Sequence, residues 1–238
     1  MSRAGAAAAV FDVDGTICDT HSTMSRSLMW LRQRQHTPWR HGLWLSSLAW
    51  RVPLLWVTDQ YNRDASDRQV YRQFAGLSAW QIAADASRCC DDVLLPICFR
   101  EARDEIAMHL AAGRRAVLVS GGIDVLLAPL AAALGAELLA QRLVASDGRL
   151  TGEYRTYEVL GDVPPGMSQA ARKAAALAKY AETSGIDLSA SFAYGDSVND
   201  LEMLAMAGTP VAVRPDRHLA RIAQTRGWAV RQWRNGGR

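Results

Sequence analysis

Short apolar runs that end in a polar or turn residue recur along the chain. Residues 7–12 are AAAVFD, residues 115–120 are RAVLVS, and residues 191–194 (SFAY) precede Gly195 and Asp196. Such a run is typical of a strand that is buried on both faces of a parallel sheet, and the glycines after the second and third runs are turn signals. We therefore predict strand-turn-helix units and an α/β fold with a doubly wound parallel sheet.

The segment between the first two runs has a different pattern. Residues 20–87 show helical spacing of apolar positions and no strand-like run. We predict that they form an α-helical cap inserted into a catalytic core of residues 1–19 and 88–238. The segment also holds six of the eight tryptophans: Trp30, Trp39, Trp44, Trp50, Trp56 and Trp80.

Two further elements are predicted after the cap. The stretch from about 89 to 112 has a helical pattern that closes at Gly113, which predicts a helix leading back to the sheet. Residues 144–154 (VASDGRLTGEY) carry Asp147 and Gly148 between alternating segments. An Asp-Gly pair in that setting predicts a β-hairpin.

Composition narrows the class of protein. The chain has 238 residues, of which 49% are hydrophobic, so it can bury one core with an inserted lobe. Its formal charge of +3 offers no strong field for nucleic acid, and we predict no nucleic-acid partner. The alanine run before Phe11 continues into a strand with acidic residues and not into a cleavage region, so we predict no signal peptide and a cytoplasmic protein.

The four cysteines show no disulfide-framework spacing, and we expect a reducing compartment. They are Cys18, Cys89, Cys90 and Cys98. The adjacent pair, Cys89 and Cys90, is predicted to be two buried helix thiols.

The segment Phe11-Asp-Val-Asp-Gly-Thr16 carries the first chemical signal. Asp12 lies at the end of a predicted strand, Asp14 can reach the same ligand from the turn, and Gly15 lets the backbone bend closely around it. Two neighbouring carboxylates repel each other unless a cation or a shared proton lies between them, which argues for a divalent metal. An acidic turn with a helix N-cap is the alternative reading of this segment alone.

The other strand ends extend this signal. Ligands of open α/β sheets bind outside the carboxyl ends of the strands. We therefore expect Asp12, Ser120 and Asp196 to converge, although they are far apart in the sequence.

With its DxDGT segment and three further motifs in order, the chain resembles the haloacid dehalogenase superfamily, and in particular the phosphoserine phosphatase-like subfamily IB. The placement of the predicted cap agrees with that subfamily. The resemblance implies that Asp12 is the nucleophile that attacks phosphorus, and that Asp14 protonates the leaving oxygen and then activates water. Relatives that cleave carbon-halogen or phosphonate bonds lack the second aspartate, so Asp14 favours phosphate esters.

The second and third motifs are assigned by the same resemblance. Ser120, with the amides of Gly121 and Gly122 at a predicted helix N-terminus, is expected to bind phosphate oxygens. Lys173 stands 23 residues before Asp196 and is expected to neutralise the nucleophile and the phosphate. The chain has 27 lysine and arginine residues, but its lysines are only Lys173 and Lys179, and Lys179 lacks the register of the motif.

The fourth motif is residues 195–200, GDSVND. The resemblance implies that Asp196 binds Mg²⁺ together with the Asp12 carboxylate and the Asp14 carbonyl. Asn199 and Asp200 would complete the shell through water or Lys173. Oxygen ligands without a matched histidine or cysteine suit octahedral magnesium better than zinc.

The leading functional prediction is a magnesium-dependent phosphatase that hydrolyses a phosphate monoester through an aspartyl-phosphate. Phosphotransfer to an acceptor other than water stays open, and a catalytically silent binding module is disfavoured because Asp12 and Asp14 are both intact. Phosphoserine phosphatases carry a glutamate soon after the first motif, where this chain has Thr20, His21 and Ser22. Phosphoserine is therefore not the expected substrate, and arginine-rich surroundings suit more anionic esters or a non-amine leaving group.

The first part of the cap is basic and rich in tryptophan. Residues 42–57 are apolar, but Arg51 and Pro53 interrupt them and the run is shorter than the roughly 20 residues that span a bilayer. The tryptophans either form the cap's own core over the active site or rest on anionic lipid, where the cap would present a lipid-linked phosphate. Residues 20–58 contain no acidic residue but five arginines: Arg26, Arg32, Arg34, Arg40 and Arg51.

Overall fold

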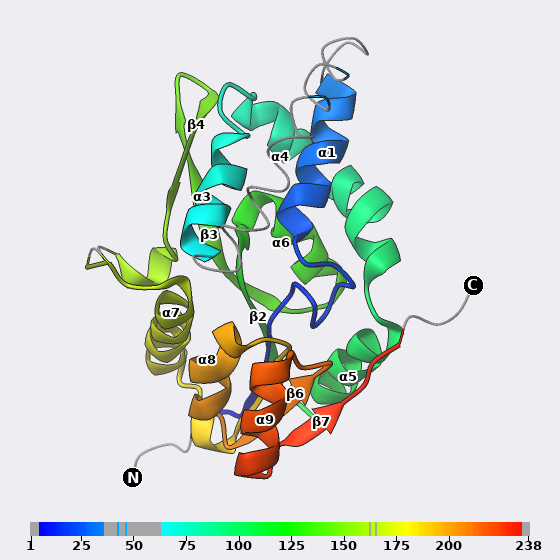
Figure 1. Cartoon of the computed structure of the whole chain (residues 1–238), viewed down its shortest axis with the longest axis vertical. Helices are drawn as coiled ribbons and strands as arrows, with labels where there is room; N and C mark the ends of the chain where they lie inside the picture. The colour runs from blue at the N-terminus through cyan, green and yellow to red at the C-terminus, as the bar shows by residue number, and fades with distance from the viewer. Residues whose placement is uncertain are drawn as a thin grey trace.

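A seven-stranded sheet forms the centre of the molecule (Figure 1). The computed structural model describes residues 5–35, 42, 46, 63–161, 163–164 and 166–234. All neighbouring strands are parallel except β3 and β4, which are antiparallel. In spatial order the strands are β4 (Arg149–Arg155), β3 (Glu137–Ser146), β2 (Arg115–Ile123), β1 (Ala8–Phe11), β5 (Phe192–Gly195), β6 (Thr209–Val213) and β7 (Ala229–Arg231).

Two hydrophobic clusters cover the two faces of this sheet. In β1, Ala9 and Phe11 belong to one cluster and Ala8 and Val10 to the other, as expected from the two-residue period of a strand. The first cluster packs against α5 (Arg100–Ala111) and α6 (Asp124–Ala133). The second packs against α7 (Gln169–Ser184), α8 (Leu201–Met206) and α9 (Arg217–Arg226). The predicted doubly wound α/β fold is confirmed.

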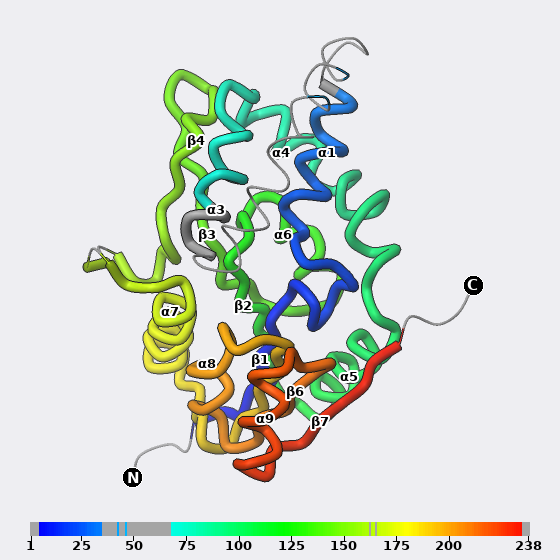
Figure 2. The backbone as a smooth tube through the Cα atoms, viewed as in Figure 1, coloured from blue at the N-terminus to red at the C-terminus, as the bar shows by residue number. Residues whose placement is uncertain are grey.

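Three of the described helices that lie between β1 and β2 in the chain occupy the upper part of the molecule in Figure 2. They are α1 (Thr23–Gln35), α3 (Arg63–Arg72) and α4 (Ala79–Cys89). Their inner faces continue the first hydrophobic cluster through residues such as Leu31, Tyr71 and Ile82. The helical character predicted for this region is thus observed in its described parts. Its boundaries as a separate cap, residues 20–87, stay a proposal.

Three arginines in the first part of the cap, Arg26, Arg32 and Arg34, contact the protein's own polar or aromatic groups. Arg26 donates from Nε to Thr20 Oγ1 at 2.9 Å, and Arg32 donates to the carbonyl of Gln73. Arg34 lies 3.9 Å from Asp85 and stacks over Trp30. These contacts give the basic bias an intramolecular explanation in this part of the chain.

Much of the tryptophan-rich segment lies outside the described residues. Of the run 42–57, only residues 42 and 46 are described. The prediction that this run does not span a bilayer therefore falls outside the described residues. Among the residues that are described, none of the helices is both long and apolar enough to span a membrane. Outside the described residues also lie Trp39, Trp44, Trp50, Trp56, Arg40 and Arg51.

The predicted hairpin is confirmed. β3 and β4 pair antiparallel and are joined at Asp147 and Gly148, whose φ angles are 50° and 72°. Positive φ at both central positions is the geometry of a type I′ turn, which Asp-Gly pairs favour.

The predicted single helix from 89 to 112 is wrong. After α4 the chain forms a π-helical turn, η1 (Cys90–Leu94), and a 3₁₀ turn, η2 (Leu95–Ile97), before α5 begins at Arg100. Pro96 cannot donate a helical hydrogen bond. Cys98 is extended and pairs antiparallel with Cys18, so a tertiary contact replaces the helix. Cys89 and Cys90 are buried thiols in helical turns, as predicted.

Candidate active site

Asp12 lies immediately after β1, at the carboxyl edge of the sheet. Its backbone N–H donates to the carbonyl of Tyr194 in the neighbouring strand β5 at 2.9 Å. Its side chain is buried, with 6% of the residue exposed. The two central strands therefore fix the position of the predicted nucleophile.

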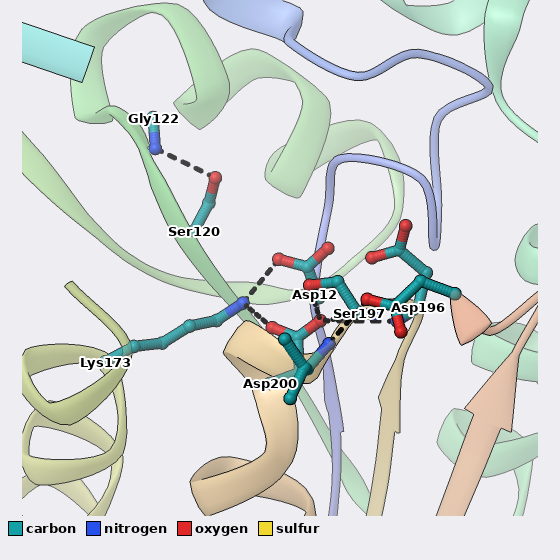
Figure 3. A network of polar contacts seen from close by, with 9 residues as sticks. Asp12, Ser120, Gly122, Lys173, Asp196, Ser197 and Asp200 are labelled. Carbon is teal, nitrogen blue, oxygen red and sulfur yellow. Dashed lines mark hydrogen bonds and ion pairs between the residues drawn. The ribbon is translucent and has the colours of Figure 1, made fainter. Parts of the chain in front are cut away.

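Lys173 reaches this carboxylate from α7. The helix begins after Ser168, whose Oγ accepts the N–H of Ala171, and Lys173 lies in its first turns. The Lys173 ammonium donates to Asp12 Oδ1 and, at 2.6 Å, to Asp200 Oδ1 (Figure 3). The other lysine, Lys179, forms an exposed ion pair with Glu182. The structure thus brings Lys173, and not Lys179, to Asp12.

Asp200 accepts hydrogen bonds from other residues of its own loop, the fourth motif. Its Oδ2 accepts the backbone N–H groups of Asp196 and Ser197 and the Ser197 hydroxyl, each at 3.3 Å. The next amide, that of Val198, donates to Asp216 at 2.9 Å. These bonds hold Asp196 and Asp200 on the same side of the loop, toward Asp12.

The carboxylates of Asp12, Asp196 and Asp200 can place one oxygen each within 4.8 Å of one another. Three carboxylates gather beside one ammonium and supply oxygen donors, which fits Mg²⁺. Gly15 contributes by its small size, because a Cβ there would lie 2.1 Å from Asp196 Oδ2. Asp200, predicted as a supporting residue, belongs to this cluster together with the predicted ligand Asp196.

Burial and charge perturb both members of the central ion pair. Burial raises the pKa of Asp12 to about 7; the Asp200 charge adds to this rise, and the Lys173 ammonium opposes it. Burial alone would lower the pKa of Lys173, but the Asp12 and Asp200 charges outweigh it and the pKa rises. Lys173 is therefore a permanent cation, and a divalent cation beside Asp12 would favour its ionised form.

Asp14 points toward the first helix of the cap region. Its Oδ1 accepts the backbone N–H of Thr23, at the start of α1, at 2.7 Å. Asp14 also lines the same pocket as Asp12, as does Asn199. The predicted acid and base is therefore held by α1, whereas the predicted nucleophile is held by the sheet.

The second motif differs from its predicted geometry. β2 continues through Gly121 and Gly122 to Ile123, and α6 begins at Asp124, so the two glycines are not at a helix N-terminus. Ser120 is 1% exposed, and its Oγ accepts the Gly122 N–H at 3.0 Å (Figure 3). Gly121 and Gly122 nevertheless line the pocket.

The pocket over Asp12 encloses about 70 Å³, and part of its wall was not foreseen from the sequence. Met24, Val70, Tyr71 and Gln169 line it, together with His21. The Tyr71 hydroxyl donates to the carbonyl of Gly121, which joins α3 to the second motif. No local pattern marks these residues, because their role depends on how the helices pack over the sheet.

Comparison with known proteins identifies relatives along nearly the whole chain. The haloacid dehalogenase-like hydrolase family matches residues 9–205. A Mycobacterium tuberculosis protein named as a probable phosphatase is 35% identical over 224 residues, covering 94% of this chain and 74% of the relative. The phosphoserine phosphatase SerB1 of the same organism is 29% identical, covering 96% of this chain and 71% of its own.

Solved structures agree with this assignment at the level of the fold. A Bordetella pertussis protein of unknown function has a TM-score of 0.75 at 26% identity, with 96% of this chain and 99% of that chain covered. A phosphoserine phosphatase with a phospho-aspartyl intermediate analogue has a TM-score of 0.63 at 22% identity, with 91% and 90% covered. The chain therefore belongs to the haloacid dehalogenase-like hydrolase family, as one of its phosphatases.

Proposed function

We propose that the chain hydrolyses a phosphate monoester in a magnesium-dependent reaction that passes through an aspartyl-phosphate on Asp12. One observation carries the proposal. The Asp12 carboxylate lies in a pocket at the end of β1, bonded to the Lys173 ammonium and within 4.8 Å of the Asp196 and Asp200 carboxylates. A carboxylate so placed can attack phosphorus while neighbouring groups offset the negative charge of the phosphoryl group.

The chain's own residues divide the reaction between them. An Asp12 oxygen attacks phosphorus, and Asp14 gives a proton to the leaving oxygen; in the second step Asp14 takes a proton from the water that attacks the aspartyl-phosphate. The Thr23 N–H fixes the orientation of the Asp14 carboxyl, and Lys173 holds positive charge beside Asp12. Asp12, Asp196 and the Asp14 carbonyl, with Asp200, would hold Mg²⁺, which stabilises charge on the transferring phosphoryl group.

The pocket wall on the helix side supports a leaving group without an amino-acid head. Among the described lining residues, that side offers His21, Met24, Val70 and Tyr71, without an arginine or a carboxylate. Phosphoserine carries an ammonium and a carboxylate, and both would lose water there without an arginine or a carboxylate from these described residues. Relatives of the chain, SerB1 among them, are named phosphoserine phosphatases, so phosphoserine is the discriminating substrate in any comparison.

The test is a phosphate-ester assay on purified protein, with p-nitrophenyl phosphate and a panel of natural esters that includes phosphoserine. Activity should require Mg²⁺, vanish on chelation and be poorly supported by Ca²⁺. Asp12→Asn should lower kcat by at least about 10⁴-fold, because the amide is no nucleophile. Asp104→Asn, an exposed aspartate paired with Arg100 on α5, is the matched control and should leave activity unchanged.

Several results would contradict the proposal. Near-native activity of Asp12→Asn would remove Asp12 as the nucleophile, and full activity in excess chelator would remove the metal. Faster phosphate transfer to an added alcohol than to water would favour the phosphotransferase. A protein with no turnover on any ester would favour the silent binding module.

A further inference from the structure

Two of the four thiols meet although they are 80 residues apart. The Sγ atoms of Cys18 and Cys98 lie 3.5 Å from each other, and all four cysteines are unbridged in the structure. Cys18 lies in the loop that follows the first motif, and Cys98 lies between η2 and α5. Their contact plays no part in the proposed phosphatase chemistry.

The backbone holds these two residues as a directly opposed pair. The Phe99 N–H donates to the Ile17 carbonyl at 2.9 Å, and the Asp19 N–H donates to the Ile97 carbonyl at 2.8 Å. The bonds flank Cys18 and Cys98, so these two form the non-hydrogen-bonded pair of a short antiparallel ladder. Such pairs have a Cα separation of about 4.5 Å, which lies within the range that a disulfide bridges.

The two thiols have different environments, and these assign Cys98 as the attacking sulfur and Cys18 as its partner. A hydrogen bond from the Cys18 thiol lowers the pKa of Cys98; burial opposes the shift, and the Arg103 charge adds to it. The same bond and burial raise the pKa of Cys18. Cys98 is 7% exposed and Cys18 is 0% exposed, so an oxidant reaches Cys98 first.

The pair also joins the two places where the chain passes between the sheet and the helices α1, α3 and α4. The Cys18 carbonyl accepts the Gly15 N–H at 2.9 Å, which connects the cysteine to the turn that carries Asp14. Cys98 lies on the return path from α4 to α5. A covalent bond between them would tie both passages together next to the active-site loop.

We propose that Cys18 and Cys98 form a reversible disulfide that slows turnover. With hydrogen peroxide as oxidant, the Cys98 thiolate attacks one peroxide oxygen, the O–O bond breaks, and a sulfenic acid and water result once a proton is taken up. The Cys18 sulfur then attacks the Cys98 sulfur, its proton and the sulfenic hydroxyl leave as a second water, and the S–S bond forms. The two thiols lose two electrons, and peroxide gains them.

The disulfide would slow turnover because the pocket is lined by residues of both the core and the helices. Asp12 and Lys173 come from the core, whereas Met24 and Tyr71 come from the helices, so the pocket widens when the two sides separate, and faster substrate entry and product release follow. A bond across both passages restricts that separation. This step rests on the proposed function, whereas formation of the disulfide does not.

The experiment treats the full chain with hydrogen peroxide and measures thiols, cross-links and activity. Titration of the denatured protein should show a fall from four free thiols to two, and non-reducing peptide mapping should find Cys18 joined to Cys98. Turnover should fall by at least about fivefold and return with dithiothreitol. Cys98→Ser should abolish both the cross-link and the reversible loss, Cys18→Ser provides a second variant, and Cys89→Ser is the matched control that keeps both effects.

Each other outcome counts against the proposal. Four remaining thiols, or a Cys89–Cys90 bridge, would overturn the disulfide. The cross-link without a change in turnover, or equal inhibition of Cys98→Ser, would overturn its control of activity. If the reduced protein hydrolyses no ester, the proposed function fails, while the thiol count and the cross-link still decide whether the disulfide forms.

Discussion

Two largely buried polar clusters lie beside the central strands β1 and β5 and differ in almost every other respect. The charged cluster consists of Asp12, Lys173, Asp196 and Asp200 at the carboxyl edge of the sheet. The His109 cluster consists of His109, Tyr194 and Glu105. His109 Nε2 lies 2.8 Å from the Tyr194 hydroxyl, which donates to Glu105 Oε1 at 2.7 Å.

The surroundings of the two clusters explain the difference. Aromatic rings enclose the His109 cluster: Phe11 stacks on Tyr194 at 4.4 Å, and Phe192 lies 4.7 Å from His109. Its hydrogen bonds are satisfied internally. The charged cluster opens into a pocket, and its carboxylates outnumber its ammonium. Burial of polar groups alone therefore does not mark a reactive site; several like charges gathered beside an accessible pocket do.

The largest effect on activity is expected when Lys173, the lysine of the charged cluster, is replaced and compared with Lys179, which lies outside both clusters. Lys173→Met removes one partner of a buried ion pair, which costs about 3–5 kcal/mol, and should lower kcat/KM by about 10²–10⁴-fold. Lys179→Met replaces an exposed lysine and should leave activity within about twofold. Steady-state kinetics with p-nitrophenyl phosphate measures both. Similar losses in the two variants would mean that Lys173 has no special place in the reaction.

The His109 cluster should affect stability and not catalysis. His109→Phe leaves the buried Tyr194 hydroxyl without this partner and should lower the free energy of unfolding by about 1–3 kcal/mol, with kcat unchanged. Urea denaturation and kinetics on the same preparation test this. A large loss of kcat in a folded His109→Phe protein would show that the two clusters are coupled.

The His109 variant should also alter the dependence of stability on pH. Burial lowers the pKa of His109; Glu105 opposes the shift and Arg114 adds to it. The unfolded chain therefore binds this proton more readily, so the stability that His109 contributes is present above about pH 6.5 and is lost as pH falls below it. His109→Phe should therefore reduce that loss when the free energy of unfolding is measured by urea denaturation between pH 7.5 and 5.5.

The smallest effect is expected at the pocket wall. Tyr71→Phe removes the hydroxyl that donates to Gly121, a loss of about 1 kcal/mol that should change KM by about fivefold and kcat less. Tyr180→Phe is the control, because the Tyr180 hydroxyl donates to Glu137 outside the pocket. An unchanged KM for every ester tested would show that Tyr71 has no part in substrate binding.

Much of this architecture could be predicted from local patterns. Buried parallel strands are short apolar runs, so the sequence indicated β1, β2 and β5 and the residues at their carboxyl ends. The Asp-Gly pair at 147–148 predicted the hairpin, because only a few residue types tolerate positive φ at both turn positions. The rarity of lysine and the motif register together singled out Lys173. These features depend on residues close in sequence or on rules that hold for any parallel sheet.

Other features were decided by contacts between distant segments. The helix predicted from 89 to 112 breaks because Cys98 pairs with Cys18, and β2 extends through Gly122, whose amide binds Ser120 instead of pointing from a helix end. Met24 and Tyr71 entered the site only through the packing of α1 and α3 over the sheet. The sequence by itself determined which groups can perform the chemistry, since strand periodicity and turn geometry are local. Tertiary structure decided which groups surround them, since that depends on packing between segments with no common local pattern.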